Sequence, residues 1–254
     1  MEKDNKRNYL YSEVCVFRKT KALYGGLSNM ASGYPLKINN NVILSSEALY
    51  QACRFPHLPE VQKNIILQKS PMSAKMVGKP FRDDSRNDWD EVRLQIMRWC
   101  LRTKLAQNFL KFGQLLESTH QKPIVEETHK EKFWGATPVD KESLSGINAL
   151  GRLLMELRDL YISKDRYKLL IVPNPEIDNF LLFGEKITVV NELDNFINFL
   201  NVESRVTVPV KSKRIKESLH NGENEQIAIS YQTNTNQEYK LVASPDNNTE
   251  ILNV

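Results

Sequence analysis

The 254-residue chain is poor in the residues that mark several classes of protein. Its three cysteines, Cys15, Cys53 and Cys100, are far apart and odd in number. They are typical of free thiols in a reducing compartment, and they favour neither a disulfide framework nor a zinc site. The four histidines also lack the spacing of metal ligands. We therefore expect no metal and no cofactor.

Long apolar runs are missing as well. No stretch approaches the roughly 20 apolar residues that a membrane-spanning helix needs, and the polar start of the chain has no apolar segment behind it that would make a secretory signal. An apolar content of 41% is ordinary for a globular protein. We expect a cytoplasmic protein, or a nuclear one if the host cell has a nucleus, with no membrane partner.

Charge is present but unevenly distributed. Residues 1–165 carry 26 Lys and Arg against 19 Asp and Glu, an excess of +7, whereas residues 166–254 carry 9 against 12, or −3. A basic first part suits an anionic ligand such as a nucleotide, but the excess is too mild to indicate nucleic acid by itself.

The composition predicts four parts: a loose tail (1–9), a main domain (10–165), a small βαβ-type appendage (166–210) and a polar, weakly structured tail (211–254). In the appendage, Lys168–Val172 and Lys186–Val190 are strand-like, and Glu192–Leu200 is an amphipathic helix. The basic run 211–217 is either a solvated linker, which we favour, or a nuclear-targeting patch. The sequence identifies no protein partner for this C-terminal third.

The first half of the main domain alternates short strands with capped helices. Residues 14–17 predict a strand, and 36–38 with 42–44 predict a hairpin around three asparagines. A serine caps a helix over residues 45–55, and Ser70-Pro71 opens another that ends at Gly78. Asp88 to Glu91 predicts a capping box, followed by a helix to about residue 116 with a break near Gly113.

Two helices carry polar residues that suit a binding site. Glu47, Gln51 and Arg54 share one helix face, although Glu47 is equally explained as a first-turn acid favoured by the helix dipole. A strand over 123–125 leads towards Trp134-Gly135. A helix over 146–161 then begins with Gly146, Asn148 and Gly151, whose neighbouring amides could receive an anion or a ribose oxygen. Asn148 is also a plain capping residue.

Seven of these segments occur in order in one known family. They are Gly26–Asn29, Ser46-Glu47 through Gln51 to Phe55, Ser70-Pro71 with Ala74-Lys75, Trp89 with Arg93 and Met97, Lys104, Glu126 with Trp134-Gly135, and Gly146–Asn148 with Leu150–Met155 and Arg158. In these residues the chain resembles the NADAR domain, or YbiA-like, family of N-glycosidases. The resemblance spans residues 14–161. Met30, Ala48 and Glu131 stand where the family usually has Phe, His and Asp.

The resemblance implies an α+β, mostly helical, compact YbiA-like (NADAR) domain, to which the C-terminal third adds a small α/β appendage. It also implies cleavage of a C–N glycosidic bond. Two kinds of substrate are associated with the family: a phosphorylated ribosylamino intermediate of riboflavin synthesis, and ADP-ribose attached to a nucleobase, notably guanine in DNA. A non-catalytic module that binds ADP-ribose or a related nucleotide is the alternative.

The chemistry of N-glycoside cleavage assigns expected roles to the matching residues. Positive charge develops on the anomeric carbon, and carboxylates stabilise it and orient or deprotonate water. Our catalytic candidates are, in order, Glu47, Glu131 and Glu126. Indoles can stack on the leaving base. The expected substrate-binding residues are Trp134, Trp89, Asn148, Gly146, Gly151, Arg152, Lys75, Asn29 and Gln51.

Overall fold

The computed structural model describes residues 5–130, 132–206, 227–232, 238–243 and 249–253. These residues divide into two compact units, Met1–Leu193 and Asp194–Val254, and each unit is described by itself. In the described part of the chain, no helix is both long enough and apolar enough to cross a membrane.

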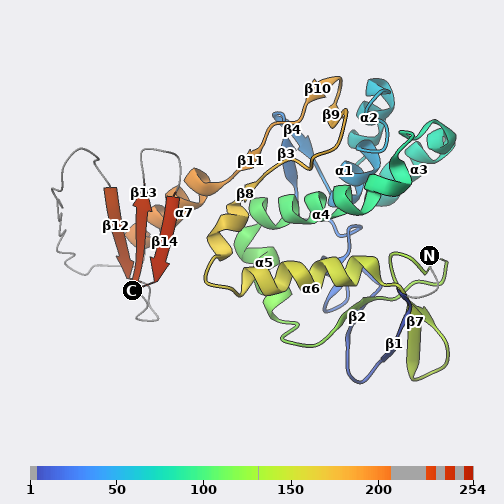
Figure 1. The fold of residues 1–254 in the computed structure, drawn as a ribbon, viewed down its shortest axis with the longest axis horizontal. Helices are drawn as coiled ribbons and strands as arrows, with labels where there is room; N and C mark the ends of the chain where they lie inside the picture. Colours follow the sequence, from blue (N-terminus) through green and yellow to red (C-terminus); the bar gives the residue numbers. More distant parts are fainter. Residues whose placement is uncertain (1–4, 131, 207–226, 233–237, 244–248, 254) are drawn as a thin grey trace. The chain divides into compact units, whose positions relative to one another are not determined.

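Helices dominate the first unit. The long helix α4 (Trp89–Gln107) packs against α6 (Ala149–Tyr161), and the two lie nearly side by side in Figure 1. Helix α5 (Phe109–Glu117) contacts both. Three short helices, α1 (Ser46–Ala52), α2 (Pro59–Ile66) and α3 (Pro71–Gly78), pack on one another, with α1 also on α4. The core between these helices contains Ile96, Leu101 and Leu154, which are almost completely buried.

Short strands surround this helical core. Strands β1 (Arg7–Leu10), β7 (Ser143–Gly146) and β6 (Thr137–Pro138) form an antiparallel sheet in that order. Strand β2 (Cys15–Phe17) runs parallel to β5 (Ile124–Glu126). Strands β3 (Leu36–Ile38) and β4 (Asn41–Ile43) make the predicted hairpin. The predicted α+β, mostly helical fold is confirmed.

Local sequence signals account for several of these elements. Ser45 accepts a hydrogen bond from the Ala48 amide at the start of α1, and Ser70 accepts one from the Ser73 amide at the start of α3, so both predicted caps are confirmed. In the β3–β4 turn, Asn39 and Asn40 have φ angles of 47° and 63°. Asparagine tolerates this left-handed backbone better than most residues, which explains the turn.

Two details predicted for the long helix are wrong. Asp88 stands before α4, but its side chain does not cap the helix; it accepts hydrogen bonds from the Arg86 guanidinium, one of them at 2.9 Å. The break falls at Asn108 between α4 and α5, not at Gly113. A Cβ at Gly113 would lie 2.1 Å from the Tyr161 ring, so this glycine allows α5 to approach α6.

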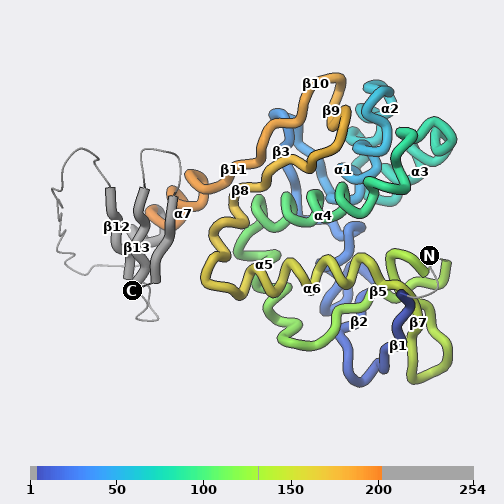
Figure 2. Tube along the Cα trace, viewed as in Figure 1, coloured from blue at the N-terminus to red at the C-terminus, as the bar shows by residue number. Residues whose placement is uncertain are grey.

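Residues 166–191 belong to the first unit and pack against its helix α4. It contains η4 (Arg166–Leu170), β8 (Ile171–Val172), β9 (Leu181–Leu182), β10 (Glu185–Lys186) and β11 (Val190–Asn191). Only the last two residues of the predicted strand 168–172 are extended, and β8 pairs antiparallel with β11. Figure 2 shows this segment running along α4, which β8 and β11 contact.

The boundary between units therefore lies after residue 193, whereas the sequence pattern suggested residue 165. The physical reason is burial: Leu170, Phe180 and Leu182 are at most 9% exposed. The Phe180 ring meets Trp99 of α4 edge-on, with 4.9 Å between centroids. These apolar side chains complete the core of the first unit.

The described residues of the second unit form one helix and three strands. Helix α7 (Leu193–Val206) begins one residue after the predicted start at Glu192 and continues beyond the predicted end at residue 200. Strands β12 (Ile227–Gln232), β13 (Glu238–Ala243) and β14 (Thr249–Asn253) form an antiparallel sheet in sequence order. The basic run 211–217 lies outside the described residues.

Candidate active site

One cavity of about 420 Å³ gathers seven of the predicted site residues: Asn29, Glu47, Gln51, Lys75, Trp89, Glu126 and Trp134. They come from α1, α3, α4, β5 and two loops. The remaining lining residues are Met30, Tyr50, Arg54, Arg82, Arg93, Met97, Thr128 and Leu150. Segments that are far apart in the sequence therefore converge on one concave surface.

Glu47 is the buried carboxylate of this cavity. It lies in the first turn of α1, is 6% exposed, and accepts a 2.9 Å hydrogen bond from Gln51 Nε2, one turn later. Burial raises the pKa of Glu47, and this effect exceeds the lowering by Lys75, by the Gln51 bond and by Arg82. A carboxyl group held in place with a raised pKa is suited to proton transfer.

Asn29 holds the start of α1 against α4. Its carbonyl accepts from the Glu47 amide at 3.2 Å, and its side-chain oxygen accepts from Ser46 Oγ at 2.8 Å. Its Nδ2 donates to the sulfur of Met97 at 2.7 Å. Asn29 was predicted to bind substrate; these bonds position the Glu47 backbone.

Lys104 supports the loop that carries Asn29. Its side chain is fully buried, and Nζ donates to the carbonyls of Gly26 at 2.7 Å and Ser28 at 3.1 Å. Nζ also lies 4.5 Å from the Tyr34 ring centroid and 4.3 Å from that of Phe112. Burial, with a smaller contribution from Lys111, lowers the pKa of Lys104 to about 7. The sequence marked Lys104 as one of the residues shared with the family, but it did not indicate this supporting role.

Aromatic rings form one wall of the cavity. Tyr50 lies 5.1 Å from the Trp89 ring and 5.7 Å from the Trp134 ring, and Phe133 packs edge-on against Trp134 at 4.9 Å. Trp89 is 7% exposed and therefore serves mainly as packing, while Trp134 is only partly buried. Burial, followed by the Glu47 charge, raises the pKa of Tyr50, so its hydroxyl stays protonated. Sequence reasoning did not select Tyr50.

Positively charged side chains also line the cavity. Among the described lining residues, Arg54, Lys75, Arg82 and Arg93 are cationic, against the carboxylates of Glu47 and Glu126. Arg54 donates to Ser85 Oγ at 2.7 Å and its guanidinium lies 4.7 Å from the Trp89 ring centroid. The Arg93 guanidinium lies 4.0 Å from the Phe133 centroid. Of these four, only Lys75 was predicted to contact substrate.

The expected anion seat at the start of α6 is already occupied by the chain itself. The helix begins at Ala149, three residues after Gly146, which ends strand β7. The amides of Ile147, Asn148, Ala149 and Leu150 donate to the carbonyls of Lys132, Gly135, Phe133 and Trp134 in that order. These backbone bonds hold the loop that bears Trp134, and they leave those four amides engaged.

Asn148 is a clamp between α6 and β5. Its φ of 53° is left-handed, and its buried side chain accepts from the Glu126 amide at 3.1 Å and donates to the Ile124 carbonyl at 2.8 Å. A Cβ at Gly151 would lie 2.1 Å from that carbonyl, so glycine permits the close approach. Asn148 and Gly151 thus position Glu126.

Two other predicted residues of this region, Gly146 and Arg152, lie away from the cavity lining. A Cβ at Gly146 would lie 2.3 Å from the Gly135 carbonyl oxygen, so Gly146 packs beneath the Trp134 loop. Arg152 donates to the Asn5 carbonyl at 2.6 Å. Glu131 lies outside the described residues.

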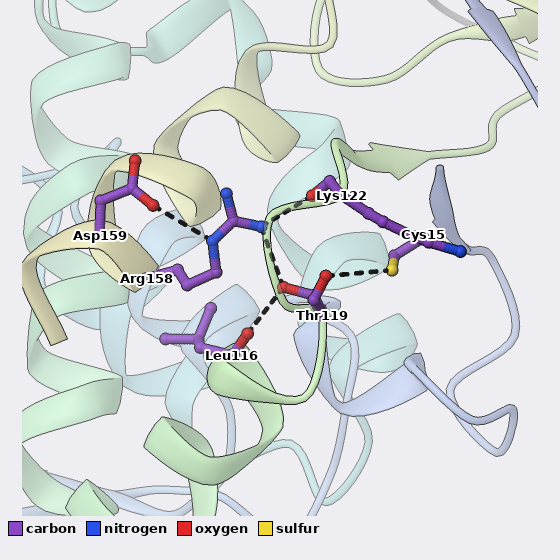
Figure 3. Close-up of polar contacts among 6 residues, drawn as sticks. All are labelled: Cys15, Leu116, Thr119, Lys122, Arg158 and Asp159. Atoms are coloured by element: carbon purple, nitrogen blue, oxygen red, sulfur yellow. Dashed lines mark hydrogen bonds and ion pairs between the residues drawn. The ribbon is translucent and has the colours of Figure 1, made fainter. Parts of the chain in front are cut away.

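A buried arginine fixes the turn that leads into β5. Figure 3 shows Arg158 of α6 donating to Thr119 Oγ1 at 3.1 Å and to the Lys122 carbonyl at 2.7 Å. The Cys15 thiol contacts the Thr119 carbonyl in the same network, while Asp159 pairs with the Arg158 Nε at 3.2 Å. Because β5 begins two residues after Lys122, this network sets the direction of the strand that ends at Glu126.

The arrangement combines three chemical capacities in one cavity: carboxylates on two walls, a partly exposed indole, and a group of cations. Carboxylates can stabilise a developing positive charge, an indole can stack on a flat ring, and guanidinium or ammonium groups can bind phosphate.

Comparison with known proteins gives a consistent result. Residues 16–161 match the NADAR domain. The N-glycosidase YbiA of Shigella flexneri serotype 5b is 36% identical over 154 residues, which cover 60% of this chain and 91% of that protein. The riboflavin biosynthesis protein VVA0006 of Vibrio vulnificus is 29% identical over 155 residues, which cover 60% of this chain and 40% of that protein. The solution structure of Escherichia coli YbiA aligns with a TM-score of 0.51 at 32% identity, covering 59% of this chain and 86% of that one.

Proposed function

The chain belongs to the NADAR domain family of N-glycosidase-type hydrolases, and we propose that it hydrolyses the C–N bond between a phosphorylated ribose and a base. The observation that carries the proposal is the buried Glu47 carboxylate, which shares a cavity with an indole and four cations. This combination matches the three parts of such a substrate: an anomeric carbon, a flat leaving group and a phosphate.

Glu47 acts at the anomeric carbon. As the C–N bond breaks, its electron pair leaves with the base, and the ribose gains oxocarbenium character that a carboxylate stabilises. A water molecule then forms the new C–O bond and gives up a proton. Glu47 orients that water or accepts its proton, and its bond to Gln51 keeps the carboxylate in one orientation. Glu126, on the strand that Asn148 clamps, is the second carboxylate.

The leaving base stacks on Trp134. Its indole is partly buried, and the edge-on Tyr50 and Phe133 rings restrict its movement. Stacking on a fixed indole supplies affinity without demanding one particular base. Trp89, which is nearly buried beneath Tyr50 and Arg54, supports this wall.

Phosphate binds to Arg54, Lys75 and Arg82. Lys75 and Arg82 line the same cavity as Glu47, and their charges partly oppose the rise of its pKa, which supports a phosphate site near that carboxyl group. An arginine presents a planar set of donors that matches phosphate oxygens, and a lysine adds a point charge. This phosphate-binding site replaces the anion-binding site that was predicted at the start of α6.

Two substrates fit this description: a ribosylamino intermediate of riboflavin synthesis and an ADP-ribosylated nucleobase. The name of the Vibrio relative points to riboflavin synthesis for that protein. The four lining cations can accommodate either one phosphate or two. A non-catalytic ADP-ribose-binding module is the second candidate, and it is supported by Ala48, which stands where the resemblance leads us to expect histidine.

The test is to incubate the full chain with both substrates and to identify released ribose 5-phosphate or ADP-ribose by mass. We expect Glu47→Gln to reduce the rate about a hundredfold or more, as removal of an electrostatic stabiliser does elsewhere. The matched control is Glu142→Gln, an exposed loop residue outside the cavity lining. Full activity of Glu47→Gln would refute the catalytic assignment. Binding of ADP-ribose without turnover of either substrate would favour the binding module.

A further inference from the structure

A second cavity, of about 560 Å³, lies in the first unit. Its lining consists of Pro56, His57, Arg86, Asn87, Asp88, Asp178, Asn179 and Leu181. The first five residues are in the segment that matches the NADAR domain, 16–161, while the last three belong to the chain that follows it. The C-terminal extension of this particular protein therefore completes the cavity.

The two cavities share a wall. The Arg86 amide donates to the Arg54 carbonyl at 3.0 Å, and Arg54 Nε donates to Ser85 Oγ at 2.7 Å, so two segments lie side by side. Arg54 and Trp89 from these segments line the active-site cavity, and Arg86 lines the second one. A ligand in the second cavity would thus lie beside the proposed phosphate seat.

Arg86 is a buried side chain in the lining of the second cavity, and hydrogen bonds hold it in place. It is 7% exposed, pairs through two nitrogens with Asp88, and donates from Nη2 to the Asp178 carbonyl at 2.6 Å. Its third nitrogen, Nη1, is buried and finds no hydrogen-bond partner among the described residues. Buried donors are nearly always paired in folded proteins, so an acceptor that reached Nη1 would stabilise Arg86.

The walls are held in place before any ligand arrives. Gln62 of α2 donates to the Leu181 carbonyl at 3.0 Å and accepts from the Phe183 amide at 2.7 Å. The neighbouring Phe180 packs on Trp99. On the other side of Asn179, the Asp178 carbonyl accepts the bond from Arg86, so contacts hold the chain on both sides of Asn179 and the cavity is largely preformed.

The charged groups that line the second cavity differ from those that line the active-site cavity. The Arg86 guanidinium is neutralised by Asp88, and Asp178 adds a further carboxylate to the lining. A phosphate would gain little here. Uncharged hydrogen-bonding groups, namely the amides of Asn87 and Asn179, lie beside the apolar surfaces of Pro56 and Leu181. Such a lining suits a flat, uncharged ring with polar edges.

We propose that the second cavity is a nucleoside-binding site, in which the base lies on Pro56 and Leu181 and its edge bonds to Asn87, Asn179 and Arg86. Its volume lies within the range of roughly 300–1,000 Å³ that is usual for small-molecule sites. The nucleoside is either the far end of a substrate whose ribosyl phosphate occupies the active site or a separate molecule. Binding at this site requires no hydrolysis.

The test is calorimetric titration of adenosine into the full chain. Asn87→Trp and His57→Trp replace two exposed lining residues with a bulky ring, and Asn64→Trp places the same ring on an exposed residue of α2 outside both cavities. We expect adenosine to bind the unchanged protein and Asn64→Trp. Affinity should fall at least tenfold in Asn87→Trp and His57→Trp. Thermal unfolding of each variant checks that it is folded.

Adenosine binding that survives both lining substitutions, or that is lost in Trp134→Ala instead, would overturn the proposal, as would no binding at millimolar adenosine. Titration with ADP-ribose distinguishes a nucleoside that is the far end of a substrate from one that is a separate molecule. Binding much tighter than that of adenosine, weakened by Asn87→Trp and by Arg82→Ala, identifies one ligand that spans both cavities; equal affinities identify a separate nucleoside, and both results support the site. Because these are binding measurements, a failed hydrolysis assay leaves them interpretable.

Discussion

The starts of helices α1 and α6 were both predicted to contribute to the binding site, but the structure uses them differently. Both have polar residues where the helix begins: Ser45 and Glu47 at α1, and Asn148 at α6. At α1, Ser45 caps the helix and Glu47 lines the cavity. At α6, the amides bind the carbonyls of the Trp134 loop and Asn148 clamps β5. The comparison teaches that the chain packed against a helix start decides whether that start is open to a ligand.

Replacing the α6 clamp should give the largest effect. Asn148→Ala removes the partners of the Glu126 amide and the Ile124 carbonyl and leaves a left-handed alanine. We expect a loss of about 4 kcal/mol of unfolding free energy, since each unsatisfied buried group costs roughly 1–3 kcal/mol. Urea unfolding measures it. Asn40→Ala, at an exposed left-handed turn, is the control and should cost about 1 kcal/mol. Equal losses in the two variants would show that Asn148 is no clamp.

Lys104, which supports the loop that carries Asn29, should make the stability of the protein depend on pH. Lys104 has a pKa of about 7 in the folded protein, below its ordinary value of 10.5. The unfolded chain therefore binds more protons between those values, and stability rises with pH across that window, by at most about 1.4 kcal/mol per pH unit. In Lys104→Met this part of the rise should be absent. Unfolding curves at pH 7, 8 and 9 compare the two proteins, and parallel pH profiles would contradict the assignment.

The cations near α1 should affect substrate binding more than turnover. We expect Arg82→Ala and Lys75→Ala each to raise KM about tenfold for a phosphorylated substrate, equivalent to roughly 1.4 kcal/mol. Arg152→Ala, near the start of α6, is the matched control because its guanidinium contacts the Asn5 carbonyl instead of the cavity. Steady-state kinetics on each variant provides the measurement. If Arg152→Ala changed KM more than Arg82→Ala and Lys75→Ala, the phosphate would bind at the start of α6 instead.

The smallest expected effect is a gain in stability. Since burial raises the pKa of Glu47, the folded protein binds more protons than the unfolded chain between the two pKa values, and stability falls as pH rises through that window. Glu47→Gln removes this penalty. We expect its Tm to exceed that of the unchanged protein by about 2–4 °C at pH 8, the equivalent of roughly 1 kcal/mol. The difference should shrink as pH drops towards 4. A lower Tm at pH 8 would indicate that Glu47 stabilises the fold.

Sequence by itself determined the local features of this protein. The serine caps, the asparagine turn and the fold class follow from short-range hydrogen bonding, backbone preference and hydrophobic periodicity. Glu47, Gln51 and Lys75 could be selected in the same way because they belong to capped helices that match the family's motifs. Their selection needed no knowledge of which segments pack together.

Only the tertiary structure decided the rest. The positions of Tyr50, Arg82 and Arg93 in the lining depend on how α1, α4 and the 3-10 helix η3 (Lys79–Asp84) converge, and no pattern of neighbouring residues encodes that convergence. The same holds for Asn148, whose left-handed backbone and buried amide make it a clamp where the sequence suggested a ligand contact. The second cavity needs the return of residues 171–191 along α4, which burial of Phe180 and Leu182 stabilises. Long-range apolar packing sets these distances, and it acts between residues that the sequence keeps far apart.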